Sequence, residues 1–399
     1  MKTTFWPFVS WLIAFLPLCC SAWFIAELAA GLRPKRIDPR RKVTDGTMAS
    51  SVILIPAHNE VGGIAQVISA LRAVCPASCR LLVVADNCTD ATATAARTAG
   101  AEVAERHDPD QRGKGFALAF GRDYLADDPP DVVLVVDADC RLAPGSVEAL
   151  VGAVMANGRP AQALDVIEPD LALPPLAQIS SFAMLVKNVV RQRGLMRLGG
   201  FSLLCGTGMA FAWSDFSAAS LATGNVVEDL GLAIGWIGSG VHPQLVEGGR
   251  VTSPAASVAD SVAQRSRWEH GFLRTALRHA VPELFGGVIT ASRARIALGL
   301  HLMVPPLALL LTLSTAVLGV VTAIACYTNI WLSAVLLGAV VALDGLLVVA
   351  VWASEGRQTL SVGSLFRAPM YILWKLPIYL RFMRAPQTAW TRTRREADR

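Results

Sequence analysis

The sequence predicts an α/β fold with a mainly parallel sheet, joined to helices that lie in a membrane. Three apolar runs of strand length begin near residues 51, 81 and 132, and segments of helical periodicity separate them. Each run ends in polar residues, as expected where buried parallel strands reach the ligand-binding edge of an α/β sheet. The segments between the runs are long enough for the right-handed crossovers that join parallel strands. We therefore expect a Rossmann-like sheet whose polar loops gather at one edge.

Composition points to the membrane part, because 53% of the residues are hydrophobic, which is high for a soluble enzyme. The excess is concentrated in residues 5–24, 296–326 and 330–352, each about long enough to cross a hydrocarbon core of roughly 30 Å. Basic residues follow the first segment, which predicts an external N-terminus and a cytoplasmic domain after it; they are Arg33, Lys35, Arg36, Arg40, Arg41 and Lys42. The alternative is a cleaved signal peptide, although the apolar run is long for one and no A-x-A site follows it.

These features predict five parts of the chain. They are a transmembrane helix over 1–28, a basic linker over 29–50, a cytoplasmic domain over 51–285, two transmembrane helices over 290–354, and an interfacial helix with a basic tail over 355–399. The interfacial helix is expected because residues 365–383 mix aromatic with basic side chains. The net charge of +5 is concentrated at these membrane flanks, and no zinc-finger or RNA-stacking motif accompanies it, so nucleic-acid binding is not expected.

Asp344 lies inside the last predicted span. A carboxyl group in a membrane segment either has a function or pairs with a hydroxyl group on a neighbouring helix, and the sequence leaves both readings open.

Two carboxylates, Asp137 and Asp139, follow the apolar run that begins at Val132. Side chains two residues apart point the same way from an extended chain, so both can approach one hard divalent cation and the phosphates that it carries. The predicted cofactor is therefore Mg²⁺ or Mn²⁺, with Asp139 the better candidate for direct ligation. An acidic turn after the strand is the alternative.

Several further motifs surround this pair in a fixed order over about residues 50–270. They are Ile55-Pro-Ala-His-Asn-Glu60, Ala85-Asp-Asn-Cys-Thr-Asp90, Arg112-Gly-Lys-Gly115, Cys205-Gly-Thr-Gly208, Glu228-Asp229 and Gln264-Arg-Ser-Arg-Trp268. With Asp137-Ala-Asp139, this set resembles the membrane-integrated branch of the family 2 glycosyltransferases of GT-A fold, which includes cellulose, hyaluronan and poly-N-acetylglucosamine synthases.

The resemblance implies a GT-A domain that transfers a sugar from a nucleotide sugar, usually a UDP-sugar, with inversion at the anomeric carbon. In such a site Glu60 and Asp86 would contact uracil and ribose, although either could instead cap a local turn. Lys114 lies between glycines that let a cation approach the diphosphate, although it could be a solvated lysine. The full donor-site prediction is Pro56, Ala57, Glu60, Asp86, Lys114, Asp137 and Arg267.

Glu228 and Asp229 precede an apolar helical segment, and a helix N-terminus favours the ionised carboxylate that a general base requires. We predict Asp229 as the base with Glu228 beside it; an ordinary N-terminal helix acid is the alternative.

On the acceptor side, Gln264, Arg267 and Trp268 share one helical face at positions i, i+3 and i+4. The resemblance places Arg267 near the diphosphate and Trp268 near the acceptor sugar. It gives Cys205, Gly206 and Thr207 the role of shaping the acceptor pocket, for which a plain tight turn is the alternative.

The sequence thus predicts a hexosyltransferase in a bacterial-type inner (plasma) membrane. The donor would be a UDP-hexose or UDP-N-acetylhexosamine and the acceptor a growing polysaccharide or oligosaccharide, with polysaccharide-export proteins as partners. About three spans leave little from which to build a polymer channel, so a glycolipid glycosyltransferase of ceramide-glucosyltransferase type is the second reading. A non-catalytic nucleotide-binding subunit is the third, and the presence of every carboxylate that the reaction needs argues against it.

Overall fold

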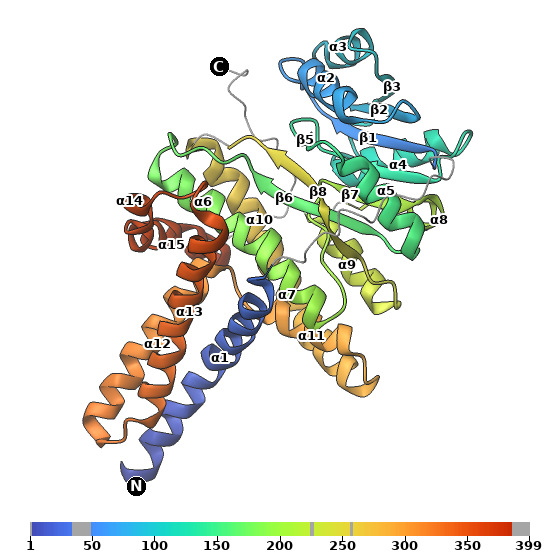
Figure 1. Cartoon of the computed structure of the whole chain (residues 1–399). Coiled ribbons are helices and arrows are strands. Elements are labelled where there is room, and N and C mark those ends of the chain that lie inside the picture. Colours follow the sequence, from blue (N-terminus) through green and yellow to red (C-terminus); the bar gives the residue numbers. More distant parts are fainter. Residues whose placement is uncertain (1, 34–48, 224–226, 256–257, 385–399) are drawn as a thin grey trace. The chain divides into compact units, whose positions relative to one another are not determined.

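The computed structural model describes residues 2–33, 49–223, 227–255 and 258–384 (Figure 1). The chain divides into two compact units. The helical unit contains the described residues of 1–33, 169–199 and 272–387, and the sheet unit contains those of 34–168 and 200–271. Residues 169–199 fall within the range predicted for the cytoplasmic domain, but in the structure they pack with the helical unit.

The sheet unit is built on eight strands in the order β3-β2-β1-β4-β7-β6-β8-β5. Their bounds are β1 Ser51–Ala57, β2 Cys79–Asp86, β3 Glu102–Arg106, β4 Val132–Val135, β5 Arg141–Leu142, β6 Ala161–Ile167, β7 Met209–Ala212 and β8 Gln244–Ser253. The first four strands pair in parallel, as the three apolar runs and their crossovers predict. β7 runs antiparallel to both β4 and β6, so the second half of the sheet is mixed.

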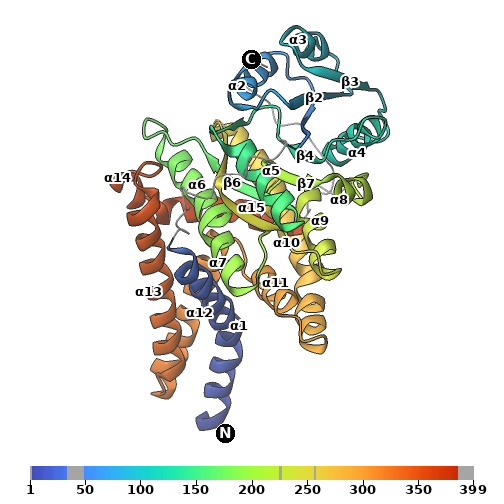
Figure 2. The ribbon, with the colours of Figure 1, turned by 45° about the vertical axis from the view of Figure 1, so that its right-hand side comes forward.

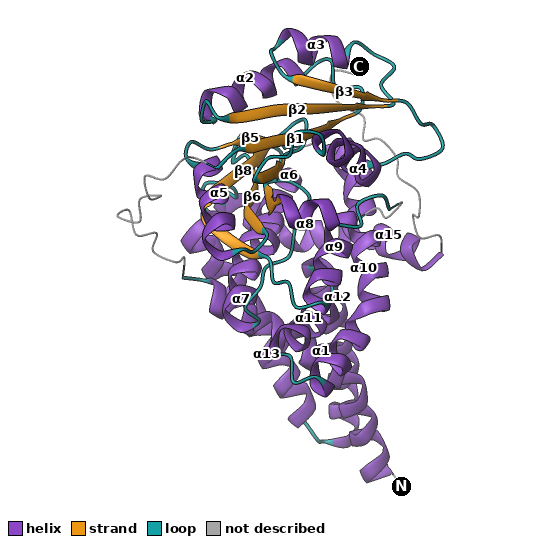
Figure 3. Ribbon diagram, turned by 90° about the vertical axis from the view of Figure 1, so that its right-hand side faces the viewer, coloured by secondary structure: helices purple, strands orange, loops and turns teal. Residues whose placement is uncertain are grey.

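Helices cover both faces of the parallel strands, as Figure 3 shows for α2 and α4. On one face, α2 (Ile64–Val74) and α5 (Ser146–Asn157) pack on a core that includes Ile53 and Val83. On the other, α4 (Lys114–Leu125) packs so closely that a Cβ atom on Gly121 would lie 2.6 Å from Leu54 Cδ1. The remaining helices of this unit are α3 Thr92–Thr98, α8 Trp213–Ala218 and α9 Glu228–Gly238.

The strand order creates a switch point between β1 and β4. The chain moves outward from β1 to β2 and β3, then returns to the other side of β1 as β4. Crossovers on either side of such a point diverge, and the carboxyl ends of the two strands open onto a crevice. Ala57 ends β1, and Asp137 follows β4 by two residues.

Among its described residues, the helical unit contains three helices long and apolar enough to cross a membrane: Phe5–Gly31, Leu307–Thr328 and Leu332–Gly356. They correspond to α1 (Lys2–Gly31), α12 (Leu307–Thr328), and α13 (Leu332–Val351) continued by η2 (Trp352–Gly356), and Figure 2 shows α1, α12 and α13 side by side. The other elements are α6 Pro175–Leu185, η1 Val186–Val190, α7 Arg191–Leu198, α11 Arg293–Met303, α14 Val362–Leu365 and α15 Ala368–Arg384; α10 (Val258–Ile289) begins in the sheet unit and ends in this one.

The apolar segment 296–326 is two helices rather than one. α11 ends at Met303 and α12 begins at Leu307, with Pro305 and Pro306 between them. A proline lacks the backbone N–H of a helical hydrogen bond and disfavours helical backbone in the residue before it, which explains the break.

Polar residues of α1 lie opposite polar residues of α13 at two positions along the packed helices. The hydroxyl oxygens of Ser10 and Ser333 lie 2.5 Å apart. Further along both helices, Ser21 lies beside Asp344, and both side chains are fully buried. One of the two interpretations of Asp344 was a hydroxyl group on a neighbouring helix, and Ser21 supplies such a group. Among the described residues, however, no hydrogen bond of normal geometry joins Ser21 to Asp344.

A buried charge cluster joins α1 to α7 and α11. Glu27 Oε2 accepts a hydrogen bond from Arg191 Nε at 2.5 Å, and Glu27 Oε1 lies 2.6 Å from His301 Nδ1. The Trp23 indole N–H also donates to Glu27 Oε1. Buried charges need such partners because isolated ones are strongly destabilising.

Candidate active site

Lys114 is the central cation of the site. It begins α4, and its Nζ donates to Asp137 Oδ1 after β4 and, at 2.6 Å, to the carbonyl oxygen of Gly206. Burial alone would lower the pKa of Lys114, but the carboxylates of Asp137, Glu228 and Asp229 outweigh it and raise that pKa. A lysine held charged in this way can neutralise phosphate oxygens.

Glu228 and Asp229 lie in the first turn of α9, beside the Gly206 loop. A Cβ atom on Gly206 would lie 3.4 Å from Asp229 Oδ2 and 3.5 Å from Lys114 Nζ. The base candidate and the cation thus both lie against Gly206, whose backbone has φ +87°, a conformation that favours glycine. Asp229 Oδ1 also accepts a hydrogen bond from the backbone N–H of Leu230 at 2.8 Å.

Burial and the neighbouring charge of Asp229 raise the pKa of Glu228 from 4.5 to about 7. Burial lowers the pKa of Arg267, whereas the carboxylates of Glu228 and Asp137 favour its charged form. The structure therefore brings together five of the predicted residues, from four separate motifs: Lys114, Asp137, Glu228, Asp229 and Arg267.

Asp137, Asp139 and Cys140 offer ligand atoms that all lie within 4.8 Å of one another. Burial raises the pKa of Cys140 well above its ordinary value, and its thiol donates to Asp139 Oδ1 at 3.5 Å, so the sulfur is held protonated. The donors suited to a cation are then two carboxylates, which is the oxygen chemistry that Mg²⁺ and Mn²⁺ prefer. Both carboxylates are only half-buried, so these residues fit a divalent ion.

The predicted donor-side residues lie at the ends of β1 and β2. Pro56 and Ala57 are the last residues of β1, and the buried Glu60 follows, with its backbone N–H donating to Thr92 Oγ1 at 2.7 Å. Asp86 ends β2, and its Oδ1 accepts a hydrogen bond from Arg106 at 2.7 Å. His58 Nδ1 lies 2.7 Å from the carbonyl oxygen of Asp86 and so ties the two strand ends together.

The predicted acceptor-side residues occupy two elements. Gln264, Arg267 and Trp268 are on α10, where Trp268 is half-buried; the side chain of Gln264 lies outside the described residues. Cys205, Gly206 and Thr207 form the loop before β7, in which the Thr207 hydroxyl accepts a hydrogen bond from the backbone N–H of Asp137 at 3.2 Å.

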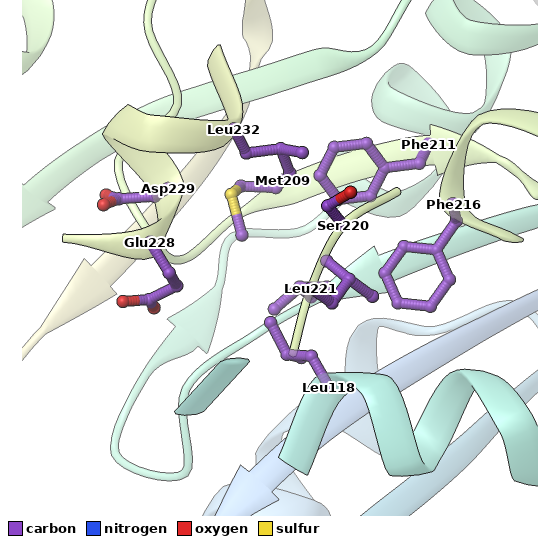
Figure 4. Close-up of a pocket in the computed structure, with 10 residues that line it drawn as sticks. Leu118, Met209, Phe211, Phe216, Ser220, Leu221, Glu228, Asp229 and Leu232 are labelled. Atoms are coloured by element: carbon purple, nitrogen blue, oxygen red, sulfur yellow. The ribbon is translucent and has the colours of Figure 1, made fainter. Parts of the chain in front are cut away.

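An apolar pocket opens beside the two acidic residues of α9 (Figure 4). Figure 4 shows the carboxylates of Glu228 and Asp229 at one end, pointing away from the aromatic rings of Phe211 and Phe216 at the other. The remaining lining residues are Leu118, Val135, Met209, Ser220, Leu221 and Leu232.

Sequence reasoning missed two residues that hold the site in place. Gln162, on β6 and fully buried, accepts a hydrogen bond from the backbone N–H of Cys205 at 2.9 Å and donates to the carbonyl oxygen of Thr207 at 2.9 Å. Arg106, at the end of β3, holds Asp86. A polar residue within the apolar run of β6 was the available clue to Gln162, and a basic residue at a strand end was the clue to Arg106.

Comparison with known proteins is consistent with this geometry. Residues 52–214 match the family model described as glycosyl transferase family 2. The mannosyltransferase PcManGT from Pyrobaculum calidifontis, solved with GDP-Man and Mn²⁺, is 16% identical with a TM-score of 0.50, over 85% of this chain and 100% of that one. Among curated proteins, none matches this chain.

A second solved structure is more similar in sequence but less so in overall shape. Glucosyl-3-phosphoglycerate synthase from Mycobacterium tuberculosis, in complex with Mn²⁺, UDP and phosphoglyceric acid, is 22% identical with a TM-score of 0.40. The match covers 55% of this chain and 76% of the synthase.

The predicted fold class is thus confirmed by the mixed GT-A-like sheet, and residues 52–214 match the model of the family that the sequence motifs resemble. Among its described residues the chain thus has a GT-A-like sheet, in which residues 52–214 match the glycosyl transferase family 2 model, and three helices long and apolar enough to cross a membrane.

Proposed function

We propose that this protein is an inverting hexosyltransferase that uses a UDP-hexose or UDP-N-acetylhexosamine and elongates a polysaccharide or oligosaccharide at the cytoplasmic face of a bacterial-type inner membrane. The observation that carries the proposal is the arrangement around Lys114. Its ammonium group contacts Asp137 and the Gly206 carbonyl, and the Asp229 carboxylate lies against the same glycine.

An inverting displacement has to stabilise the leaving diphosphate and to remove a proton from the attacking hydroxyl group, and this arrangement offers groups for both. The leaving diphosphate would lie beside Lys114 and Arg267, whose positive charges stabilise its phosphate oxygens as the glycosidic bond breaks. Asp139, with Asp137, would hold a divalent ion, which when bound supplies further positive charge to the same oxygens. In an inverting displacement the general base lies on the acceptor side of the sugar. Asp229 would be that base and would accept the proton of the attacking hydroxyl group.

Glu60, Asp86, Pro56 and Ala57 would form the nucleoside end of the donor site. Their support is position: they follow β1 and β2, next to the switch point of the sheet. Arg106 would keep Asp86 oriented for the ribose or base through their 2.7 Å ion pair.

Glycolipid synthesis is the second candidate, because the three apolar helices found among the described residues leave little from which to build a polymer channel.

The deciding experiment incubates purified membranes with radiolabelled UDP-sugars in turn and sorts the product into solvent-extractable lipid and large polymer. Label in polymer supports the first proposal, and label in lipid supports the second. No transfer from any UDP-sugar, with transfer from a GDP-sugar, would contradict the donor assignment.

A further inference from the structure

An open groove of about 450 Å³ lies in the helical unit, and none of the residues assigned to the transfer reaction lines it. It is lined by residues from α1, from the end of α7, and from α11 with the turn before it: Trp23, Leu198, Ala291, Arg293, Ile296 and Ala297. Five of these six side chains are hydrocarbon or indole, and Arg293 is the cation. The groove is therefore amphiphilic, with apolar walls and a positive charge.

That positive charge is not neutralised within the described part of the chain. Arg293 donates its hydrogen bonds to the carbonyl oxygens of Leu198 and Arg197, the last residues of α7. Arg197 in turn donates to the carbonyl oxygens of Ala30 and Arg33, at the end of α1. Carbonyl groups orient a guanidinium group but carry no net charge, and no ion pair joins either arginine to a carboxylate among the described residues.

The position of the groove relative to α1 suggests its environment. Trp23 belongs to the apolar span Phe5–Gly31, and Ala30 and Arg33 mark the end of that span. Tryptophan side chains favour the boundary between hydrocarbon and headgroups, and arginines favour the anionic headgroup layer. An apolar wall continuous with such a boundary can hold an acyl chain, while the guanidinium group of Arg293 in the groove can hold a phosphate.

We propose that this groove binds an anionic membrane phospholipid, with an acyl chain against Trp23, Leu198 and Ile296 and the headgroup phosphate beside Arg293 and Arg197. The lipid would supply the counter-charge that these two arginines lack among the described residues. Its binding would also link the ends of α1 and α7 to the start of α11.

The test measures how phospholipids shift the thermal midpoint of the detergent-purified full chain, and how much lipid it retains in native mass spectrometry. Phosphatidylglycerol should raise the midpoint more than phosphatidylcholine does, whereas inorganic phosphate should not. Arg293→Gln and Arg197→Gln should each weaken phosphatidylglycerol binding by about fivefold, since one basic residue at an anionic surface contributes about that factor. The matched control is Arg278→Gln, which removes an exposed arginine of α10 that does not line the groove.

A second variant separates lipid binding from local damage. Ile296→Trp fills the apolar wall without changing charge, so it should reduce binding of phosphatidylglycerol while the midpoint of the lipid-free protein stays near wild type. Three results would overturn the proposal: equal effects of the two lipids, an equal loss of binding in Arg278→Gln, or an equal response to inorganic phosphate, which would indicate an anion site only. Because every readout is lipid binding rather than sugar transfer, the outcome does not depend on the proposed function.

Discussion

At the scale of single residues, the carboxylates of the site have different neighbours, so replacing each with an amide should separate their roles. Asp139→Asn removes the charge of a proposed metal ligand but no core contact, because the side chain is only half-buried. We expect metal-dependent transfer to be lost while the thermal midpoint stays near wild type. Asp123→Asn, an exposed residue of α4, is the control. Near-normal turnover in Asp139→Asn at ordinary Mg²⁺ or Mn²⁺ concentration would exclude the ligand assignment.

Asp229→Asn should affect the chemical step rather than donor binding. If Asp229 is the general base, kcat should fall by a factor on the order of 10²–10⁴ while the affinity for UDP stays close to wild type. Calorimetry with UDP and single-turnover transfer measure the two quantities. A collapse of UDP affinity would instead assign Asp229 to the donor site.

Glu228 should make stability depend on pH, because its pKa in the folded protein is about 7 and its ordinary value is 4.5. Between these values the folded protein holds a proton that the unfolded chain releases, so stability should decrease as pH rises through this window and level off above it. In Glu228→Gln that decrease should be smaller, which thermal midpoints of both proteins from pH 5 to pH 8 would show. Parallel curves for the two proteins would mean that Glu228 does not titrate in this range.

How far the sequence predicts the site depends on whether a contact is local. Asp137, Lys114 and Asp229 could be predicted as site residues because each lies at the end of a strand or at the start of a helix. The periodicity of the hydrophobic residues reveals those positions in the sequence. The hydrogen bonds of Gln162 to the Cys205 loop join residues 43 and 45 positions apart, and no local pattern specifies them. The same holds for Arg106, which meets Asp86 only because β3 pairs with β2.

At the scale of elements, the packing of α1 against η1 and α7 depends on glycine. A Cβ atom on Gly194 would lie 2.2 Å from the carbonyl oxygen of Glu27, and one on Gly31 would lie 1.9 Å from that of Val190. Backbone cannot move aside as a flexible side chain can, so Gly194→Ala should destabilise the helical unit by roughly 1–3 kcal/mol.

The matched control is Gly319→Ala in α12, because a Cβ atom there meets no heavy atom within 4 Å. Thermal midpoints of the two variants in the same detergent provide the comparison. Equal midpoints for Gly194→Ala and Gly319→Ala would show that the close approach of α1 and α7 at Gly194 does not contribute to stability.

Element boundaries show the same limit on sequence prediction. The apolar segment 296–326 has the composition of one long span, yet Pro305 and Pro306 divide it, and a proline pair is a local feature that could have been weighed. The antiparallel pairing of β7 with β4 and β6 could not be predicted, because the sequence of a four-residue strand carries no information about the direction of its partner strand.

At the scale of the whole molecule, the charge distribution predicts topology. An impermeant thiol reagent applied to intact cells should label a cysteine placed at Thr328, in a Cys326→Ser background, but not one placed at Ala49. The reason is that basic residues cluster after the first span and at Arg293, Arg295 and Arg357, whereas the turn between α12 and α13 has no charge. Labelling at Ala49 would mean that the first span is inverted or cleaved, and the donor could not then come from the cytosol.

The contacts of α1 have a consequence for biosynthesis. Its side-chain partners lie far along the chain: Ser10 meets Ser333 and Glu27 meets His301, at sequence separations of 323 and 274 residues. A ribosome adding about 5–20 residues per second needs roughly 15–60 s to make the intervening chain. α1 must therefore wait for α11 and α13, with the Glu27 carboxylate and the Ser10 hydroxyl group still lacking their final partners. Its stay in the bilayer before they arrive should need assistance, and the rate of synthesis should influence how much protein assembles correctly.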